Sequence, residues 1–196
     1  MLYTVVGDNM YDDILKLADE IANYIEIKDY EIPDIDLYMD QVTSFMNNKL
    51  SDFKRNNDDI ILSKTMINNY AKNKVIPSPN KKKKYSKKHM MILIWVYHLK
   101  QTLSINDIGK LMNFMTVDEK NSINYTEIYN SFLDIQNKSS KNLKTDLEKM
   151  FQTIEGTNSN FDYDEKLFLL VLELILSANI QKRLAEKIID NCFNNQ

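Results

Sequence analysis

The residues of this chain that could bind a polyanion are concentrated near its middle. Residues 60–106 contain ten lysines and no aspartate or glutamate, although the whole chain of 196 residues has a formal net charge of −3. The segment therefore carries +10, and the rest of the chain carries −13. Such an asymmetry is typical of proteins that bind nucleic acids. The alternative is a solvated basic face that has no partner.

Within this segment, a short helix is expected from Ser63, a good N-cap residue, to about Asn73. Helical spacing puts its apolar side chains on one face and leaves five polar side chains on the other. The inward set is Met66, Ile67, Tyr70 and Ala71, and the outward set is Lys64, Thr65, Asn68, Asn69 and Lys72. Asparagine can form two hydrogen bonds with adenine in the major groove, and lysine can bind guanine or phosphate. The outward face could therefore read duplex DNA.

The segment that follows, residues 75–85, cannot be helical, because Pro77 and Pro79 fix the backbone and four consecutive lysines repel one another. An extended loop or a tight β-ribbon fits this length, and its lysines would meet phosphates without reading sequence. The helix and the loop together supply the candidate DNA-binding residues, which are Lys64, Thr65, Asn68, Asn69, Lys72, Lys74, Lys81, Lys82, Lys83, Lys84 and Tyr85.

Helices are expected to position this surface, because three glycines and three prolines are too few for a sheet with many turns. Two amphipathic helices come first, over residues 10–25 and 35–53. The almost wholly apolar run 90–99 must be a buried helix. Ser104 opens another, whose expected buried residues are Ile105, Ile108, Leu111 and Met112. Three or four more helices follow, at about 125–136, 142–154, 164–177 and 180–193.

Three stretches, in this order, resemble the winged helix-turn-helix of MerR-type regulators. Residues 63–77 resemble the recognition helix with its trailing aliphatic pair and proline, Tyr85-Ser86 resembles the end of the wing, and 99–108 resembles the next helix pair. Lys74 stands where those regulators have a glycine. Residues 33–113 also resemble an uncharacterised bacterial domain-of-unknown-function family, family number 1836.

The expected fold class is therefore all-α, with a MerR-like winged helix-turn-helix that carries a small β wing. We expect an N-terminal helix in residues 1–32, the winged helix-turn-helix DNA-binding domain in residues 33–115, and a C-terminal helical bundle in residues 116–196.

Other residues that could do chemistry do not form a recognisable site. His89 and His98 lack further ligands at metal-binding spacing, and Asn158-x-Asn160-x-Asp162 lacks the glycine and closing glutamate of a calcium loop. We therefore expect no enzyme activity, no catalytic residue, no cofactor and no metal. Five methionines could line a ligand pocket or simply fill gaps in the core, and the sequence identifies no small-molecule effector. They are Met90, Met91, Met112, Met115 and Met150.

The expected compartment is the cytoplasm. Cys192 is the only cysteine, which excludes an internal disulfide and suits a reducing environment. The N-terminus carries Asp8, Asp12 and Asp13, unlike a signal peptide. The longest apolar run, near residues 167–176, is about half of what a bilayer span needs, so we expect no membrane partner.

These features predict a transcriptional regulator that binds double-stranded DNA. One short recognition helix reads only a few base pairs, so a homodimer is expected. Its candidate surface is the helix at 164–177, whose run 167–172 is apolar all round, although that helix could equally be the core of the C-terminal bundle. Two other functions stay open: a non-enzymatic protein-interaction module that kept the winged-helix fold without binding DNA, and an enzyme whose site is not visible.

Overall fold

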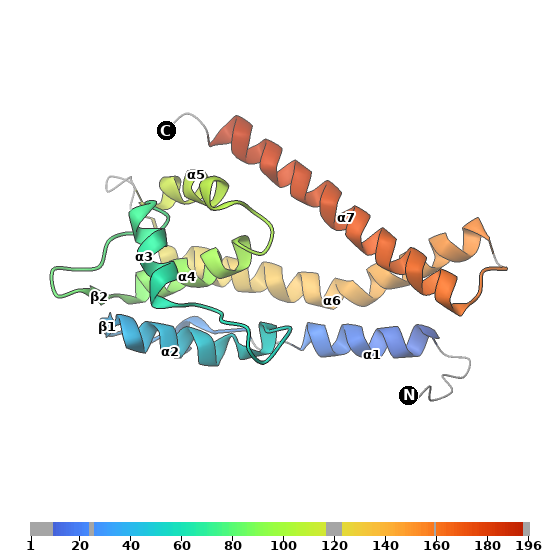
Figure 1. Ribbon diagram of the computed structural model, residues 1–196, viewed down its shortest axis with the longest axis horizontal. Helices are drawn as coiled ribbons and strands as arrows, with labels where there is room; N and C mark the ends of the chain where they lie inside the picture. Colours follow the sequence, from blue (N-terminus) through green and yellow to red (C-terminus); the bar gives the residue numbers. More distant parts are fainter. Residues whose placement is uncertain (1–9, 24–25, 117–122, 159, 194–196) are drawn as a thin grey trace. The chain divides into compact units, whose positions relative to one another are not determined.

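The computed structural model describes residues 10–23, 26–116, 123–158 and 160–193. These residues form seven α-helices, two short 3₁₀ helices and one two-stranded sheet, so the all-α class is confirmed (Figure 1). The chain divides into two compact units, which we describe separately. One comprises Met1–Tyr24 with Leu133–Gln181, and the other comprises Ile25–Phe132 with Lys182–Gln196.

The second unit is organised around α4 (Lys87–Leu99), in which every side chain from residue 90 to residue 97 is buried. A fully buried helix was expected here, and this expectation is confirmed. The helices α2 (Met39–Lys49), α3 (Lys64–Lys72) and α5 (Ile105–Thr116) each contribute buried apolar side chains to the same unit. On α5, Ile108 and Met112 are buried as expected, whereas Ile105 is exposed.

A two-stranded antiparallel sheet joins β1 (Leu37–Tyr38) to β2 (Lys84–Tyr85). Leu37 pairs with Tyr85, and both are buried, while Tyr38 pairs with Lys84. The helix expected over 35–53 is therefore shorter than predicted. It begins after Tyr38 because residues 37–38 are extended, and it ends at Lys49, before a 3₁₀ turn at Ser51–Phe53.

The side chain of Asn47, on α2, fixes the segment that leads into α3. Its Nδ2 donates to the Leu62 carbonyl (2.7 Å), and its Oδ1 accepts from the Ile61 backbone N–H (3.1 Å). Ser63 follows directly and caps α3, its Oγ accepting a hydrogen bond from the Met66 N–H (3.2 Å). The predicted cap is thus confirmed, and one amide fixes the start of α3 against α2.

The second unit also includes the first residues of α6 (Tyr125–Thr157). The fully buried Tyr129 donates its hydroxyl to the Ile27 carbonyl (2.7 Å), which joins the segment before α2 to the start of α6.

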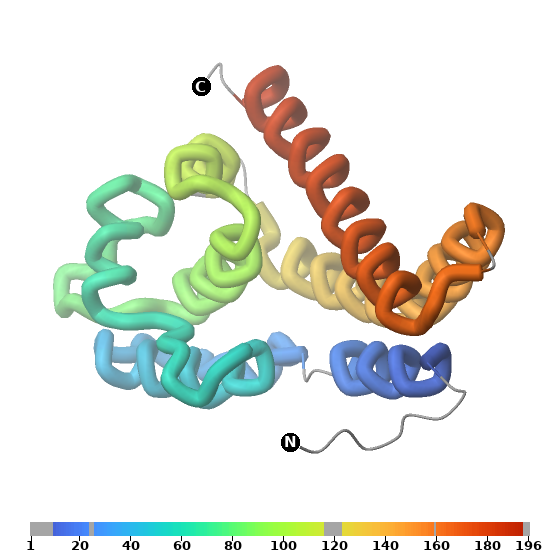
Figure 2. Tube along the Cα trace, turned by 45° about the vertical axis from the view of Figure 1, so that its right-hand side comes forward, coloured from blue at the N-terminus to red at the C-terminus, as the bar shows by residue number. Residues whose placement is uncertain are grey.

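The first unit contains α1 (Met10–Ala22), most of α6 and the first part of α7 (Tyr163–Cys192). Figure 2 shows α6 turning back into α7 as a helical hairpin. Its core consists of Ala18, Leu147, Phe151, Ile154 and Leu170. The end expected for the first helix, at residues 24–25, lies outside the described residues.

Two breaks expected within these helices do not occur. The segments 125–136 and 142–154 belong to one helix, as do 164–177 and 180–193. The residues between them are Asn, Lys and Ser at 137–141 and Ala and Asn at 178–179, and neither gap contains a glycine or proline, the residues that most disfavour a helix.

The helix at 164–177 is also not buried all round. Leu170 is 2% exposed, but Phe168 and Val171 are 64% and 57% exposed.

We expect Asn47→Ala to lower the free energy of unfolding by about 1–3 kcal/mol, because it leaves the Ile61 N–H and the Leu62 carbonyl without their partner. Urea titration followed by circular dichroism measures this. Asn48→Ala is the matched control, since its side chain is exposed on the same turn. Equal losses of unfolding free energy from the two variants would show that the hydrogen bonds of Asn47 do not fix the segment before α3.

Candidate nucleic-acid interface

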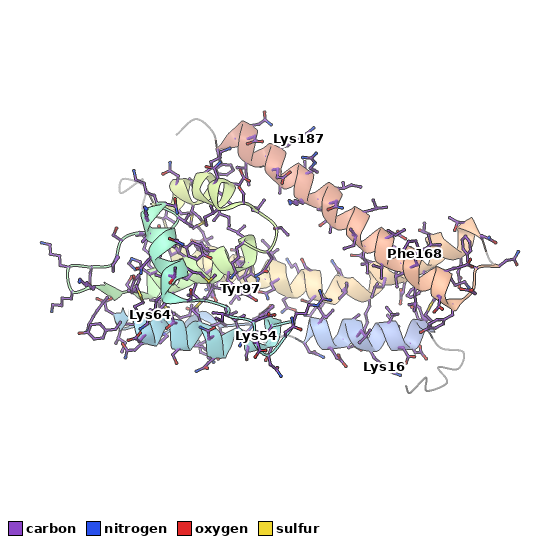
Figure 3. The ribbon with its side chains drawn as sticks, viewed as in Figure 1. Lys16, Lys54, Lys64, Tyr97, Phe168 and Lys187 are labelled. Carbon is purple, nitrogen blue, oxygen red and sulfur yellow. The ribbon has the colours of Figure 1, made fainter. Side chains whose placement is uncertain are left out.

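The outward face of α3 has the composition expected from the sequence. Ile67 and Tyr70 point into the core, with exposed fractions of 0% and 7%. The five side chains predicted to face outward, Lys64, Thr65, Asn68, Asn69 and Lys72, are all exposed. Figure 3 labels Lys64, in the first turn of α3, whose ammonium group makes an ion pair with the exposed Asp40 of α2. The helix therefore presents three amide or hydroxyl groups between two lysines.

The C-terminal end of α3 has a hydrogen-bond pattern that usually requires glycine. The Val75 N–H donates to the Tyr70 carbonyl (2.8 Å), and the Lys74 N–H donates to the Ala71 carbonyl (3.1 Å). Together these two bonds make a Schellman motif, in which the residue at the position of Lys74 adopts a left-handed conformation. Lys74 does so with φ 56°. The backbone thus keeps the shape that glycine favours, although the side chain is lysine.

The segment between α3 and β2 is a loop that extends away from the helices (Figure 1). We call residues 77–85 the lysine loop. The Asn80 Oδ1 organises it by accepting from the backbone N–H groups of Lys82 (2.9 Å) and Lys84 (3.0 Å). The Lys83 N–H donates to the Asn80 carbonyl (2.8 Å), and Lys83 has φ 57°. The side chains of Lys81, Lys82 and Lys83 are exposed.

The buried His89 fastens the lysine loop to the start of α4. Its Nδ1 accepts from the Ser86 N–H (3.1 Å), and its Nε2 lies 3.2 Å from the Ser78 carbonyl oxygen. These partners assign the proton of the neutral ring to Nε2. Burial lowers the pKa of His89 from its ordinary value. Sequence reasoning gave His89 no role, although its position three residues after the N-cap Ser86 has the spacing of a capping box.

One candidate residue is removed by the structure. Tyr85 is 2% exposed, because in β2 its side chain points into the core opposite Leu37, so it cannot contact DNA. The neighbouring Lys84 is half-buried, with its Nζ 4.6 Å from the centroid of the Tyr38 ring. Tyr38 is 54% exposed and is the aromatic side chain that this edge presents to solvent.

Not every lysine of the basic segment contributes free surface charge. Lys100 is half-buried and donates to the Ile61 carbonyl (2.9 Å), and burial lowers its pKa. Lys87 lies 3.8 Å from Asp29. The exposed lysines of the basic segment are therefore those of α3, Lys74, Lys81 to Lys83 of the lysine loop, and Lys88 of α4.

Within the described ranges, no group of three or more His, Cys, Asp or Glu side chains could hold a metal ion. None of the helices that the structure describes is both long and apolar enough to cross a bilayer.

Residues 27–132 match the family described as Domain of unknown function (DUF1836). This range covers more than half of the chain and nearly coincides with the Ile25–Phe132 part of the second unit. Searches of curated proteins and of solved structures found no match.

We expect the protein to lose stability on acidification because of His89. The unfolded-state pKa of histidine is roughly 6.5. Since burial lowers the folded-state pKa of His89, the unfolded chain binds the proton first. The stabilising contribution is therefore present above about pH 6.5 and is lost as the pH falls through the folded-state value. Urea titrations at pH 7.5, 6.5 and 5.5 measure it.

His89→Gln should lose less unfolding free energy over this pH range than the unmodified protein. His98→Gln is measured for comparison, because burial also lowers the pKa of His98. Its titration therefore accounts for part of the loss of unfolding free energy at low pH. An unchanged pH dependence in His89→Gln would exclude the role given to His89.

Proposed function

The chain belongs to the Domain of unknown function (DUF1836) family, and we propose that its matched part is a MerR-like winged helix-turn-helix that binds double-stranded DNA. In this proposal α3 is the recognition helix, the lysine loop is the wing, and the protein is a cytoplasmic transcriptional regulator.

The observation that carries the proposal is the placement of two strained lysines. Among the described residues, Lys74 and Lys83 are the two non-glycine residues with positive φ. This conformation costs a side-chain-bearing residue roughly 1–2 kcal/mol, which glycine avoids. Both residues lie at the edges of the proposed DNA surface, one at the end of α3 and the other in the lysine loop. Glycine would avoid this strain, yet both positions carry lysine. This supports a function for the lysine side chain, and we assign that function to its charge.

The two parts of the surface have different roles in this proposal. Asn68 and Asn69 are exposed in the middle of α3, where their amides can pair with adenine edges in the major groove. The lysines contact phosphates, which give affinity and orientation without sequence information. Asp40 holds Lys64 in an exposed ion pair, which a phosphate could replace, because such pairs contribute little to stability.

Lys74→Gly combined with Lys83→Gly should weaken binding to any duplex while stabilising the fold. Removal of two phosphate contacts lowers the slope of log affinity against log salt by about 2. Relief of the two left-handed lysines raises the free energy of unfolding by roughly 1 kcal/mol in total, after the larger backbone entropy of glycine is subtracted. Fluorescence anisotropy with a labelled random duplex at several KCl concentrations measures the first effect, and urea titration measures the second.

Lys138→Ala with Lys141→Ala is the matched control, because it removes two exposed lysines of α6 from the other unit and should leave the slope unchanged.

Asn68→Ala with Asn69→Ala should instead cost roughly 1–3 kcal/mol per base contact on a sequence selected from random DNA, with much less effect on unselected DNA. If the affinity for DNA depends neither on the salt concentration nor on the substitutions of Lys74, Lys83, Asn68 and Asn69, the protein-interaction module is favoured.

We further propose that two copies pair through α7. An exposed apolar stripe runs along this helix and includes Phe168, Leu172, Leu176 and Ile180, which are 40–70% exposed; Figure 3 labels Phe168. The stripe is complementary to itself in an antiparallel arrangement centred on residue 174. That arrangement sets Phe168 against Ile180 and Leu172 against Leu176 of the second copy.

Charge supports the same pairing. In that register, Glu165 of one copy lies opposite Arg183 of the other, at both ends of the stripe. The Arg183 side chain lies 3.6 Å from Glu186 of its own helix but is 82% exposed, so it can exchange this weak ion pair for one with a second helix. An apolar centre with opposite charges at its edges is the usual composition of a specific interface.

Analytical ultracentrifugation at tens of micromolar should find a dimer. Leu172→Glu with Leu176→Glu should give a monomer, because it places four carboxylates at the centre of the pairing. Ile135→Glu is the control, since Ile135 is 64% exposed on α6, outside the stripe, and should leave the dimer intact. A monomeric unmodified protein at that concentration would contradict the pairing.

A further inference from the structure

The second unit contains an apolar cavity that the proposed DNA contact does not use. Its volume is about 320 Å³, and its lining comes from α4, α5, the start of α6 and the residue that follows α7. Prominent in the lining are Trp95, Met112, Met115, Ile128 and Phe132. Among the described residues of the lining there is no lysine, arginine, aspartate or glutamate, so these residues offer a nonpolar surface.

Among the described lining residues, the one titratable side chain is His98, and its surroundings keep it uncharged. The His98 ring lies beside the rings of Phe53 and Phe132, with centroid distances of 5.3 and 5.4 Å. Burial lowers its pKa from the ordinary value, so the ring is neutral at pH 7. A charged ligand would lose its hydration here without gaining a partner, which makes its binding unfavourable.

The volume of the cavity sets the size of its ligand. An apolar cavity of about 150 Å³ holds one benzene ring in a well-studied engineered protein. The pocket here is open to solvent on one side and offers about twice that volume, enough for two fused rings. Flat rings also suit the aromatic side chains of the lining, since aromatic pairs gain energy beyond the area that they bury. Phe114 and Ile128 are 43% and 38% exposed, so the cavity is reached from solvent on their side.

We propose that this cavity binds an uncharged aromatic molecule of about two fused rings. From the sequence, Met112 and Met115 could either line a ligand pocket or fill gaps in the core. In this proposal they line the pocket. This binding does not depend on DNA binding, because none of the lining residues belongs to α3 or the lysine loop.

Naphthalene is the probe that tests the proposal, with naphthalene-2-sulfonate as the same ring system carrying a charge. Trp95 is the single tryptophan of the chain and lines the cavity, so its fluorescence reports occupancy. Naphthalene should change this fluorescence saturably and bind one molecule per chain by isothermal titration calorimetry. The sulfonate should bind at least about tenfold more weakly, because its charge cannot be desolvated without cost.

Ile128→Arg should weaken naphthalene binding by at least about tenfold, because it places a charge at the opening of the cavity. Ile135→Arg is the matched control two turns along the same helix and should bind as the unmodified protein does. Circular dichroism establishes that both variants fold. Absence of naphthalene binding up to its solubility limit, equal binding of the sulfonate, or equal weakening by both variants would each overturn the proposal.

Discussion

A helix that is apolar in every direction has to be covered on every side, and α4 imposes this constraint on the second unit. Eight consecutive side chains, residues 90–97, are buried. Burial of one large apolar side chain contributes about 1.5–3 kcal/mol, so no arrangement that leaves α4 uncovered can compete. The start of α6 packs on α4 through Tyr125 and Tyr129, whose ring centroids lie 6.4 and 6.0 Å from that of Trp95. The ring of Phe53 lies 6.1 Å from that of Tyr97. Helix α3 turns Ile67 and Tyr70 into the core of the same unit, and its opposite face, which carries the polar residues, is left to solvent.

Apolar packing does not fix irregular backbone, and three side chains do that here. Asn47 satisfies the backbone before α3, Asn80 organises the turn of the lysine loop, and His89 ties the loop to α4. Each supplies hydrogen-bond partners to backbone groups of the segments that connect the helices, where such groups need a partner. The geometry of the proposed DNA surface thus depends on a small number of polar contacts around a large apolar core.

The sequence predicts those features that depend on neighbouring residues. Ser63 caps α3, Ser104 caps α5 through Asp107, and the two faces of α3 follow from helical spacing. What it could not predict depends on residues far apart in the chain. Tyr85 looks like a surface residue among lysines, but its pairing with Leu37 turns it inward. The predicted division of α6 and α7 is an error of another kind, because the segments 137–141 and 178–179 contain neither glycine nor proline and do not end a helix. The clamp of Asn47 on Ile61 and Leu62 spans fifteen positions and has no local pattern.

The left-handed backbone at Lys74 and Lys83 also bears on how the family diverges. Under the proposed function, each position has two demands that conflict: the backbone favours glycine, and the proposed DNA contact favours a positive charge. In a relative that binds DNA through these positions, the benefit of the positive charge exceeds the cost of the left-handed backbone, so lysine or arginine is retained. In a relative that has lost that contact, selection acts on folding alone, and glycine or asparagine should replace lysine at both positions together. The residues at these two positions would therefore distinguish the relatives that bind DNA from those that do not.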